Sequence, residues 1–409
     1  THVVYVYRMK FTLSTVTKCS GRLGVLGGLD RLPNLSLQTP AFIFHTKVSE
    51  RSAKRKANFR SCSRVRVCVR ACCVFLWQGG SIPHLSKEAM QHVSGDPSCF
   101  LHLSISNTLH MQEAIKASRI TIAEFIAQSN CATLLFVRDP SEPPIPGLPE
   151  KDSLPIYTRN GRRNITLEQY MTLVETFRPD AYVPLYDGDT DASSSKKRDQ
   201  KSLDRTEKFV EQCLEWHRKS DALQSSCLIG PVVGGYNEKL REQSVAFLRQ
   251  SDDAFAGYLI EGLHMHGPSV ARMDGSAALG IVANVCKQLP EAKVRLCFGS
   301  YDPALVLEMV AAGVDVFDTS YVYLKAAQEH RALVFSFDVT STEQEHVTEL
   351  DTTDARWAED FGPLLPGCKC YTCQKHSRAY VHHLHNTREM LGPILLMMHN
   401  LHHYVEFFK

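Results

Sequence analysis

The sequence has no long apolar run and no large excess of charge of either sign, and each absence narrows the class of protein. No stretch approaches the roughly 18 apolar residues that cross a bilayer, so we expect no integral membrane segment. The apolar stretch near the start, residues 3–7, is too short for the core of a signal peptide. Lys and Arg number 46 against 44 Asp and Glu, and a net charge of +2 neither indicates nor excludes a nucleic-acid partner.

The composition also lacks the biases of disordered, collagen-like and disulfide-stapled small proteins. Fourteen cysteines in 409 residues, without a secretion signal, favour a reduced compartment in which clustered cysteines bind metal. We therefore expect a cytoplasmic protein. At roughly 150 residues per domain the length predicts two or three domains, although a single α/β barrel often runs to about 250 residues.

One segment differs from the rest in charge. Residues 51–77 hold eight Arg or Lys and no acidic residue, together with four of the cysteines, which leaves 38 basic against 44 acidic residues elsewhere. A basic arm for RNA or an anionic membrane is one interpretation. We favour the other, that 49–78 is an insertion foreign to the fold, with a gene-model artefact as one origin. Residues 1–8, which precede Met9, are predicted to be a non-native leader of the same kind.

From residue 100 onward, β-rich runs alternate with amphipathic stretches at intervals of about 30–45 residues, which indicates parallel βαβ units. The predicted strands are 132–137, 181–186, 227–233, 256–263, 294–299 and 314–317. The predicted helices are 108–128, 167–177, 205–219, 238–250, 270–288, 303–312 and 378–398. With at least two more strands before residue 80, the pattern favours a (β/α)₈ TIM-type barrel. An open doubly wound sheet is the alternative.

The same pattern divides the chain. We expect N-terminal strands in 9–48, the barrel in 79–337, an acidic loop in 338–360, and a metal-binding region with a C-terminal helix in 361–409. Residues 188–204, rich in Ser, Asp and Lys, are predicted to be a surface insertion. Within that insertion, Lys196, Lys197 and Arg198 are candidates for contacts with phosphate, although such runs are usually solvated.

The clearest chemical signal is a set of three thiols and a later histidine: Cys368, Cys370, Cys373 and His399. Three cysteines within six residues can wrap around one tetrahedral ion, and a helix can bring His399 back as the fourth ligand. Cys₃His is a common closed zinc site without an open position for water or substrate. The spacing therefore predicts one structural Zn²⁺ rather than a catalytic one.

Several segments match one known family in order. They are the Cys368–Cys373 motif with His399-Asn400-Leu401, the run Arg378–Leu384, Gly234-Gly235 after a strand, Gly257–Leu263, and Gly313–Asp318. Together these segments resemble the tRNA-guanine (queuine) transglycosylases. The resemblance implies a (β/α)₈ barrel with a C-terminal zinc-binding insert, one Zn²⁺ per subunit, and replacement of a guanine in tRNA by a modified base. In that chemistry one Asp attacks the ribose C1′, and a second Asp, in an Asp-Ser-Gly-Gly-Phe-Gln motif, handles protons.

The family's catalytic pattern is broken here. Asp318 aligns with the nucleophile and Asp187 with a base-recognition carboxylate, but the Asp-Ser-Gly-Gly-Phe-Gln string occurs nowhere. Val233 stands where the family has the base-binding Gln, and Glu261 replaces the first of two glycines that clamp the base. A pocket that reads its ligand by hydrogen bonds loses discrimination when its donors are missing. We therefore expect no catalytic residues, with Asp318 a remnant nucleophile and Asp187, Val233 and Glu261 base-pocket remnants.

Resemblance and losses together predict a non-catalytic subunit of a heterodimeric queuine tRNA-ribosyltransferase. Such a subunit would support exchange of guanine for queuine at wobble position 34 of the GUN-anticodon tRNAs for Asp, Asn, His and Tyr. Its partner would be the catalytic subunit, contacted through the zinc region and the apolar run 384–408, and tRNA would be met through the complex. The resemblance also implies peripheral association with the mitochondrial outer membrane. The alternatives are an active transglycosylase with Asp318 as nucleophile, a homodimeric queuine-binding protein without a tRNA role, and a plain zinc-stabilised scaffold.

Overall fold

The computed structural model describes residues 9–16, 21–47, 80–94, 99–144, 152–158, 161–337 and 348–409. Contacts divide the chain into two compact units, and each is described by itself. The barrel unit comprises Thr1–Thr46 and Ser98–Asp318, and the C-terminal unit comprises Lys47–Pro97 and Thr319–Lys409. The predicted leader 1–8, the basic segment 49–78 and part of the acidic loop lie outside the described residues, so those predictions stay untested.

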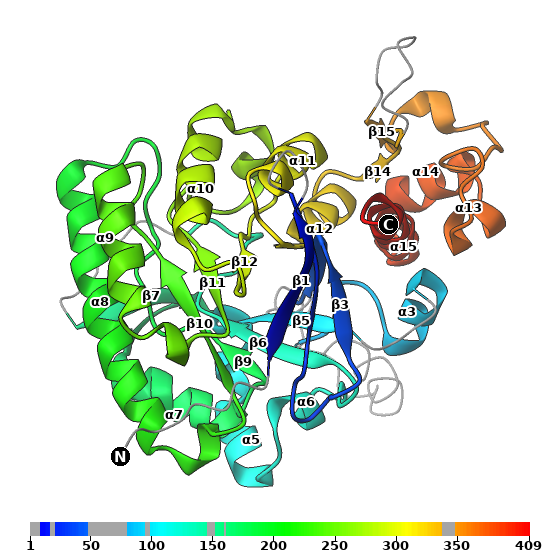
Figure 1. Ribbon diagram of the computed structural model, residues 1–409. Helices are drawn as coiled ribbons and strands as arrows, with labels where there is room; N and C mark the ends of the chain where they lie inside the picture. Colours follow the sequence, from blue (N-terminus) through cyan, green and yellow to red (C-terminus); the bar gives the residue numbers. More distant parts are fainter. Residues whose placement is uncertain are drawn as a thin grey trace. The chain divides into compact units, whose positions relative to one another are not determined.

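Eight parallel strands close into a barrel, as the sequence predicted, and the open-sheet alternative is wrong (Figure 1). In spatial order the strands are β10 (Cys227–Val232), β11 (Gly257–Ile260), β12 (Val294–Leu296), β13 (Val316–Asp318), β4 (Ala41–His45), β5 (Phe100–Ser104), β6 (Ala132–Phe136) and β9 (Ala181–Tyr182). The strand β4 comes from the 9–48 segment, so the barrel is not confined to 79–337. Most strand residues are buried on both faces, as expected for a parallel sheet wrapped by helices.

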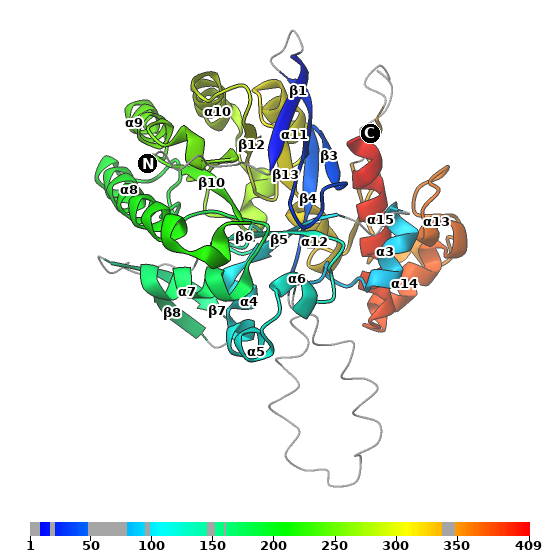
Figure 2. The ribbon, with the colours of Figure 1, turned by 60° about the horizontal axis from the view of Figure 1, so that its bottom comes forward.

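Helices surround these strands (Figure 2). They are α4 (Ile105–Thr108), α5 (Gln112–Ser118), α6 (Ile122–Phe125), α7 (Leu167–Phe177), α8 (Lys196–Lys219), α9 (Glu238–Arg249), α10 (Ser276–Gln288) and α11 (Pro303–Ala311). The prediction of a surface insertion over 188–204 is wrong in its second half. Ser195 caps α8 by accepting a hydrogen bond from the Arg198 N–H, so the helix begins nine residues before the predicted start at Arg205.

Two small antiparallel sheets complete the barrel unit. The first joins β1 (Lys10–Val16), β2 (Arg22–Gly27) and β3 (Ser36–Thr39), and the second is the hairpin of β7 (Ser153–Thr158) and β8 (Gly161–Thr166). Arg22 fixes the first sheet, since its buried guanidinium donates to the Glu291 carbonyl and lies 3.4 Å from Asp315 Oδ2. That carboxylate also accepts from the Arg295 N–H, at the start of β12.

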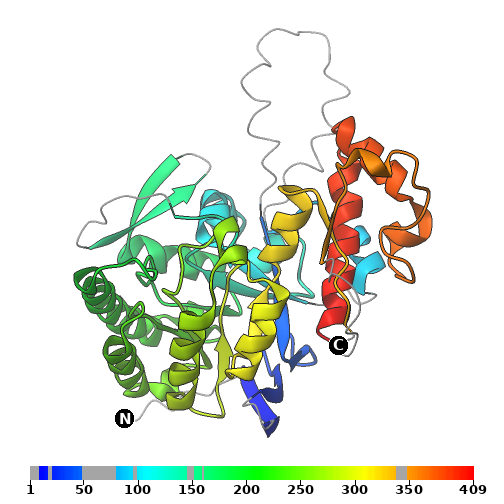
Figure 3. The same ribbon diagram turned by 90° about the horizontal axis from the view of Figure 1, so that it is seen from above.

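The C-terminal unit is built around its last helix, α15 (Leu391–Phe407). The elements α3 (Lys87–Ser94), α12 (Ser320–Ala327), α13 (Tyr371–Lys375), α14 (Arg378–Asn386) and β14 (Arg331–Leu333) all pack against it (Figure 3). The short strand β15 (Glu349–Asp351) pairs antiparallel with β14. The single helix predicted over 378–398 is two helices, because α14 ends at Asn386 and a turn with Arg388 at φ 55° precedes α15. None of the helices in the described ranges is long and apolar enough to cross a membrane.

Candidate functional site

The four predicted metal ligands lie together in the C-terminal unit. The Nδ1 atom of His399 is 3.9 Å from the Cys368 Sγ, 3.4 Å from the Cys370 Sγ and 3.3 Å from the Cys373 Sγ. All four ligand atoms lie within 4.8 Å of one another. Cys370 and His399 are buried, whereas Cys368 and Cys373 are half-buried. In the part of the chain that is described, this is the one such cluster of three or more His, Cys, Asp or Glu.

These separations suit a tetrahedral metal. Zn–S bonds of about 2.3 Å and Zn–N bonds of about 2.0–2.1 Å give S···N edges of about 3.6 Å, close to the observed values. The Cys370 Sγ also accepts a hydrogen bond from the Cys373 N–H at 3.3 Å, which orients this sulfur. The donor set, three soft sulfurs and one imidazole nitrogen, is that of a structural zinc site. The residues therefore fit Zn²⁺.

A second layer of contacts orients His399. Its Nε2–H donates to the Leu333 carbonyl at 3.0 Å, which leaves the Nδ1 lone pair facing the thiols. The neighbouring Asn400 holds the same strand, because its Oδ1 accepts from the Leu333 N–H at 2.9 Å and its Nδ2 donates to the Arg331 carbonyl at 2.8 Å. Such outer contacts fix the tautomer and ring orientation of a histidine ligand. The strand β14 thus supports the candidate metal site, a role that was not predicted from the sequence.

Protons compete with a metal for the ligand atoms of this cluster. Burial by itself would lower the pKa of His399, but contacts with the Cys368 and Cys373 thiols raise that pKa to about 9. Side-chain contacts with Cys370 and Cys373 lower the pKa of the Cys368 thiol. Without an ion, the cluster is therefore a thiolate and imidazole competing for protons in a buried space. A divalent cation would replace those protons.

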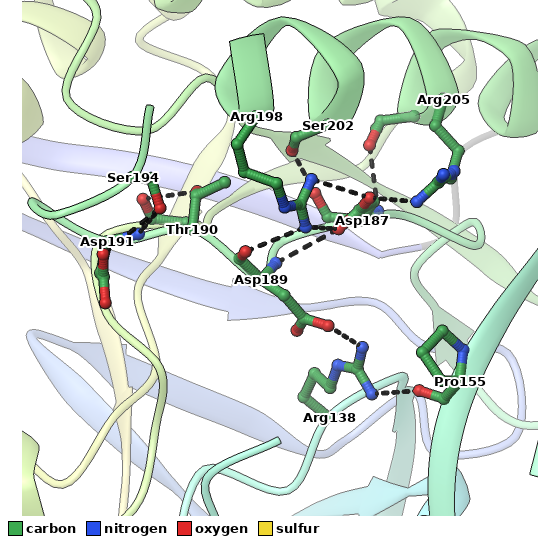
Figure 4. Close-up of polar contacts among 12 residues, drawn as sticks. Arg138, Pro155, Asp187, Asp189, Thr190, Asp191, Ser194, Arg198, Ser202 and Arg205 are labelled. Carbon is green, nitrogen blue, oxygen red and sulfur yellow. Dashed lines mark hydrogen bonds and ion pairs between the residues drawn. The ribbon is translucent and has the colours of Figure 1, made fainter. Parts of the chain in front are cut away.

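The second candidate region is the carboxyl end of the barrel strands, where barrel enzymes carry their active sites. Asp187, which follows β9, is 0% exposed, and both of its carboxylate oxygens are bound by arginines of α8. Arg198 NH2 lies 2.5 Å from Oδ1, Arg198 NH1 donates to Oδ2 at 3.1 Å, and Arg205 NH1 lies 2.6 Å from Oδ2 (Figure 4). The two arginines are seven positions apart, two turns of one helical face. Asp187 is therefore engaged within the chain.

This arrangement corrects the prediction for Arg198. The Lys196–Arg198 run is the first turn of a helix and not a loop, and the guanidinium of Arg198 turns inward to Asp187. A second ion pair lies beside the first, between Arg138 after β6 and Asp189, and Arg138 NH1 also donates to the Pro155 carbonyl at 2.8 Å (Figure 4). Three arginines thus face two aspartates at this end of the barrel.

Glu261, at the end of β11, is 4% exposed and has two polar partners. The Tyr186 hydroxyl donates to its Oε1 at 3.1 Å, and the His266 Nε2 lies 3.5 Å from its Oε2. Burial would lower the pKa of His266, but the Glu261 carboxylate raises it above the usual value. The contacts with Tyr186 and His266 thus offset part of the burial cost of Glu261. The next residue, Gly262, has φ 76°, a conformation that few other residues adopt without strain.

The two remaining predicted positions are also buried. Val233 is 0% exposed, and its N–H donates to the Ser244 hydroxyl at 3.2 Å. Asp318, the last residue of β13, accepts a hydrogen bond from the Gly299 N–H at 2.8 Å. Between the ends of β10 and β11 runs the fully buried side chain of Arg241, which donates to the Val232 and Gly235 carbonyls, both at 2.9 Å. Desolvation lowers the pKa of Arg241 to about 10.

Several buried rings of the barrel unit contact one another. His102 stacks on Phe136 with centroids 4.4 Å apart, and Phe298 meets both rings edge-on at 5.2 and 4.8 Å. His264 contacts Tyr301, with Nε2 2.7 Å from the hydroxyl. Every one of these side chains is buried. The positions assigned to a base pocket by the resemblance, Asp187, Val233 and Glu261, are buried as well.

Sequence reasoning missed one polar cluster in this region. His45 Nε2 lies 2.9 Å from Asp139 Oδ1, and Asn107 Nδ2 donates to Asp139 Oδ2 at 2.7 Å, all three residues being buried. They follow or end the adjacent strands β4, β5 and β6. Each is a single polar residue at a strand end without a motif around it. Only its position near the end of a strand could have pointed to it in the sequence.

Comparison with known proteins bears on both regions. The sequence profile described as queuine tRNA-ribosyltransferase matches residues 69–409, which is most of the chain. This chain belongs to the queuine tRNA-ribosyltransferase family. It is also 92% identical over 401 residues to the queuine tRNA-ribosyltransferase accessory subunit 2 of Anopheles gambiae, covering 98% of this chain and 86% of that protein.

More distant relatives carry the same name. The chain is 51% identical over 403 residues to the Culex quinquefasciatus protein, covering 98% of this chain and 86% of the relative. It is 41% identical over 401 residues to the Drosophila mojavensis protein, covering 98% of this chain and 87% of that relative. Each is called queuine tRNA-ribosyltransferase accessory subunit 2. The predicted family is therefore confirmed. The strand order confirms the barrel, and the four predicted metal ligands lie together within the matched residues.

Proposed function

We propose that this chain is the non-catalytic subunit of a heterodimeric queuine tRNA-ribosyltransferase. With a catalytic family member as partner, it supports replacement of guanine by queuine at wobble position 34 of the tRNAs for Asp, Asn, His and Tyr. The observation that carries the proposal is that the polar groups at the barrel's carboxyl end are bound to one another. Above all, Arg198 and Arg205 bind the carboxylate of Asp187.

The chemistry supports this reading. A base-recognition carboxylate must offer free acceptor oxygens to a purine edge, whereas both oxygens of Asp187 are already bound. Glu261 adds a negative group, held by Tyr186 and His266, where a bound base would need space. Val233 offers no side-chain hydrogen bond. Asp318 is buried with a backbone N–H as its partner and lacks the family's proton-handling motif.

The metal centre is proposed as one structural Zn²⁺ per subunit, held by Cys368, Cys370, Cys373 and His399. The ion would join the segment Cys368–Cys373, at the start of α13, to α15. The His399–Leu333 hydrogen bond would connect both to β14. A closed set of four protein ligands leaves no position for water or substrate, so the ion would stabilise the fold without taking part in base exchange.

The C-terminal unit also offers apolar surface for the partner. Phe361 is 82% exposed and Met390 54% exposed, and Tyr371, Tyr380 and Leu391 are exposed to a smaller extent. By contrast, Leu395, Met397, Met398 and Tyr404 of the same apolar run are buried in their own unit. Large exposed apolar side chains near one site are typical of protein–protein interfaces. We propose that these residues contact the catalytic subunit, and that tRNA is met through the assembled complex.

Co-expression with a catalytic family member tests the proposal. We expect a one-to-one complex that incorporates labelled queuine into a guanine-34 tRNA, whereas this chain alone incorporates none. The matched control is Asp318→Asn in this chain, which should leave the activity of the complex unchanged, while the same change at the nucleophile of the catalytic subunit abolishes it.

Three results would contradict the proposal, each in a different way. Turnover by this chain alone, or an RNA adduct at Asp318 that disappears in Asp318→Asn, would indicate an active transglycosylase. Calorimetric binding of queuine by this chain without complex formation would indicate a homodimeric binding protein. Absence of a complex and of queuine binding would leave only a zinc-stabilised scaffold. Peripheral association with the mitochondrial outer membrane is proposed from the resemblance, and carbonate extraction of purified mitochondria tests it.

A further inference from the structure

A pair of cysteines lies at the amino end of the barrel, opposite the end discussed above. Cys99 directly precedes β5 and Cys131 directly precedes β6. Their Sγ atoms are 3.3 Å apart, and both residues are thiols. Cys99 is half-buried and Cys131 is 1% exposed.

The strand register makes this proximity a property of the fold. In the parallel β5–β6 pair, Phe100 lies opposite Ala132, and the Ala132 N–H donates to the Cys99 carbonyl at 2.8 Å. Cys99 and Cys131 are therefore the next opposed positions, and opposed residues on neighbouring parallel strands point to the same side. Strands pair about 4.8 Å apart, which lies within the usual range of about 4.4–6.8 Å between the Cα atoms of a disulfide.

The surroundings favour reaction between the two thiols. The Cys131 S–H donates to Gln128 Oε1 at 3.5 Å, so its sulfur lone pairs remain available to Cys99. The guanidinium of Arg31 donates to the Cys131 carbonyl and forms an ion pair with Asp180 at 2.6 Å. Because the Arg31 charge is already paired with Asp180, the feature that favours oxidation is the partial exposure of Cys99, which admits a small oxidant.

We infer that Cys99 and Cys131 form a peroxide-responsive dithiol that closes into a disulfide. Hydrogen peroxide oxidises the Cys99 thiol to a sulfenic acid and leaves as one water. The Cys131 sulfur then attacks the sulfenic sulfur, forming the S–S bond and releasing a second water. Two thiols and one peroxide thus give one disulfide and two waters. The disulfide closes a loop of chain that contains β5, α5 and α6. Reduction by a dithiol opens it again.

Peptide mapping of the full-length, metal-loaded protein tests this inference. After treatment with hydrogen peroxide and alkylation, we expect a peptide pair joined through Cys99 and Cys131, two hydrogens lighter than the separate thiol peptides, which disappears on reduction with dithiothreitol. Cys227 is the matched control because it also begins a barrel strand, is buried, and faces Ala181 rather than a cysteine. It should remain an alkylatable thiol when the treated protein is unfolded.

Two variants complete the design. We expect peroxide to raise the unfolding temperature of the wild type. In Cys99→Ser the joined peptide and this rise should both be absent. Because Cys131 is buried and a polar replacement could disturb the strand, Cys131→Ala serves as the second variant, and there Cys99 should proceed to sulfinic or sulfonic acid. The inference is overturned if wild-type Cys99 over-oxidises while Cys131 stays a thiol. It is also overturned if either cysteine joins a different cysteine instead.

Discussion

Replacing Asn400 by Ala should weaken zinc binding although Asn400 is not a ligand. Asn400 is 0% exposed, and its amide makes two hydrogen bonds to β14, one to the Leu333 N–H and one to the Arg331 carbonyl. The Leu333 carbonyl in turn accepts from His399 Nε2. Removal of the amide therefore frees the strand that orients the only nitrogen ligand.

The size of the effect follows from these contacts. The buried Leu333 N–H and the partly buried Arg331 carbonyl lose their partners. Each loss costs about 1–3 kcal/mol, so the C-terminal unit should lose about 2–6 kcal/mol of stability. Complete loss of the Leu333–His399 contact would lower metal affinity by about 10–100-fold, or about 1.4–2.7 kcal/mol, so loosening β14 should lower it by up to that amount. Since metal binding is coupled to folding, both effects should appear together.

Competition with a chromophoric chelator measures the zinc affinity of folded protein, and urea titration with and without chelator measures the coupling. Asn386→Ala is a matched control, because Asn386 Nδ2 lies 2.7 Å from His382 Nε2 on α14 and touches none of the ligands. It should bind zinc as tightly as the wild type. Wild-type affinity in folded Asn400→Ala would refute the reasoning about β14.

Three further predictions concern other regions. Asp187→Asn should destabilise the barrel unit by about 2–4 kcal/mol in urea unfolding, because two partly buried arginines lose their charge partner; an unchanged midpoint would show that the ion pairs contribute nothing. Burial lowers the pKa of His217 to about 4, so the folded state keeps it neutral and stability falls as pH drops from about 6.5 towards 4. Its share of that loss at pH 5.5 is about 1.4 kcal/mol and should vanish in His217→Gln, as urea titrations at pH 7.5 and 5.5 would reveal. Phe361→Glu and Met390→Glu should each reduce recovery of the catalytic subunit in co-purification while leaving thermal unfolding of this chain unchanged.

The barrel could be predicted because the sequence patterns of its strands and helices are periodic and local. Apolar runs such as 132–137 and 227–233 alternate with amphipathic helices, and the observed strands begin at the predicted residues, Ala132 and Cys227. The metal ligands could be predicted equally well, since three thiols at short spacing have few other uses. The start of α8 was missed because Lys, Ser and Asp suggested a loop, whereas a single N-cap at Ser195 sufficed to begin the helix.

Partners distant in sequence could not be predicted. Nothing in the sequence links Glu261 to Tyr186 and His266, or Asn400 to β14, because these contacts depend on how strands are ordered around the barrel and how α15 packs. The engagement of Asp187 had a weak local signal in the seven-residue spacing of Arg198 and Arg205. Its meaning required knowing that α8 passes over the end of β9.

The composition of the C-terminal unit constrains the order of events during synthesis. Its helix α3, at residues 87–94, leaves the ribosome before seven of the eight barrel strands, yet the helix against which it packs, α15, begins only at residue 391. A nascent chain can therefore complete its barrel while α3 still lacks its docking partner. Chaperone capture of that early helix, or delayed loading of the proposed ion, would trap molecules whose barrel is folded and whose α3 and α15 have not yet met.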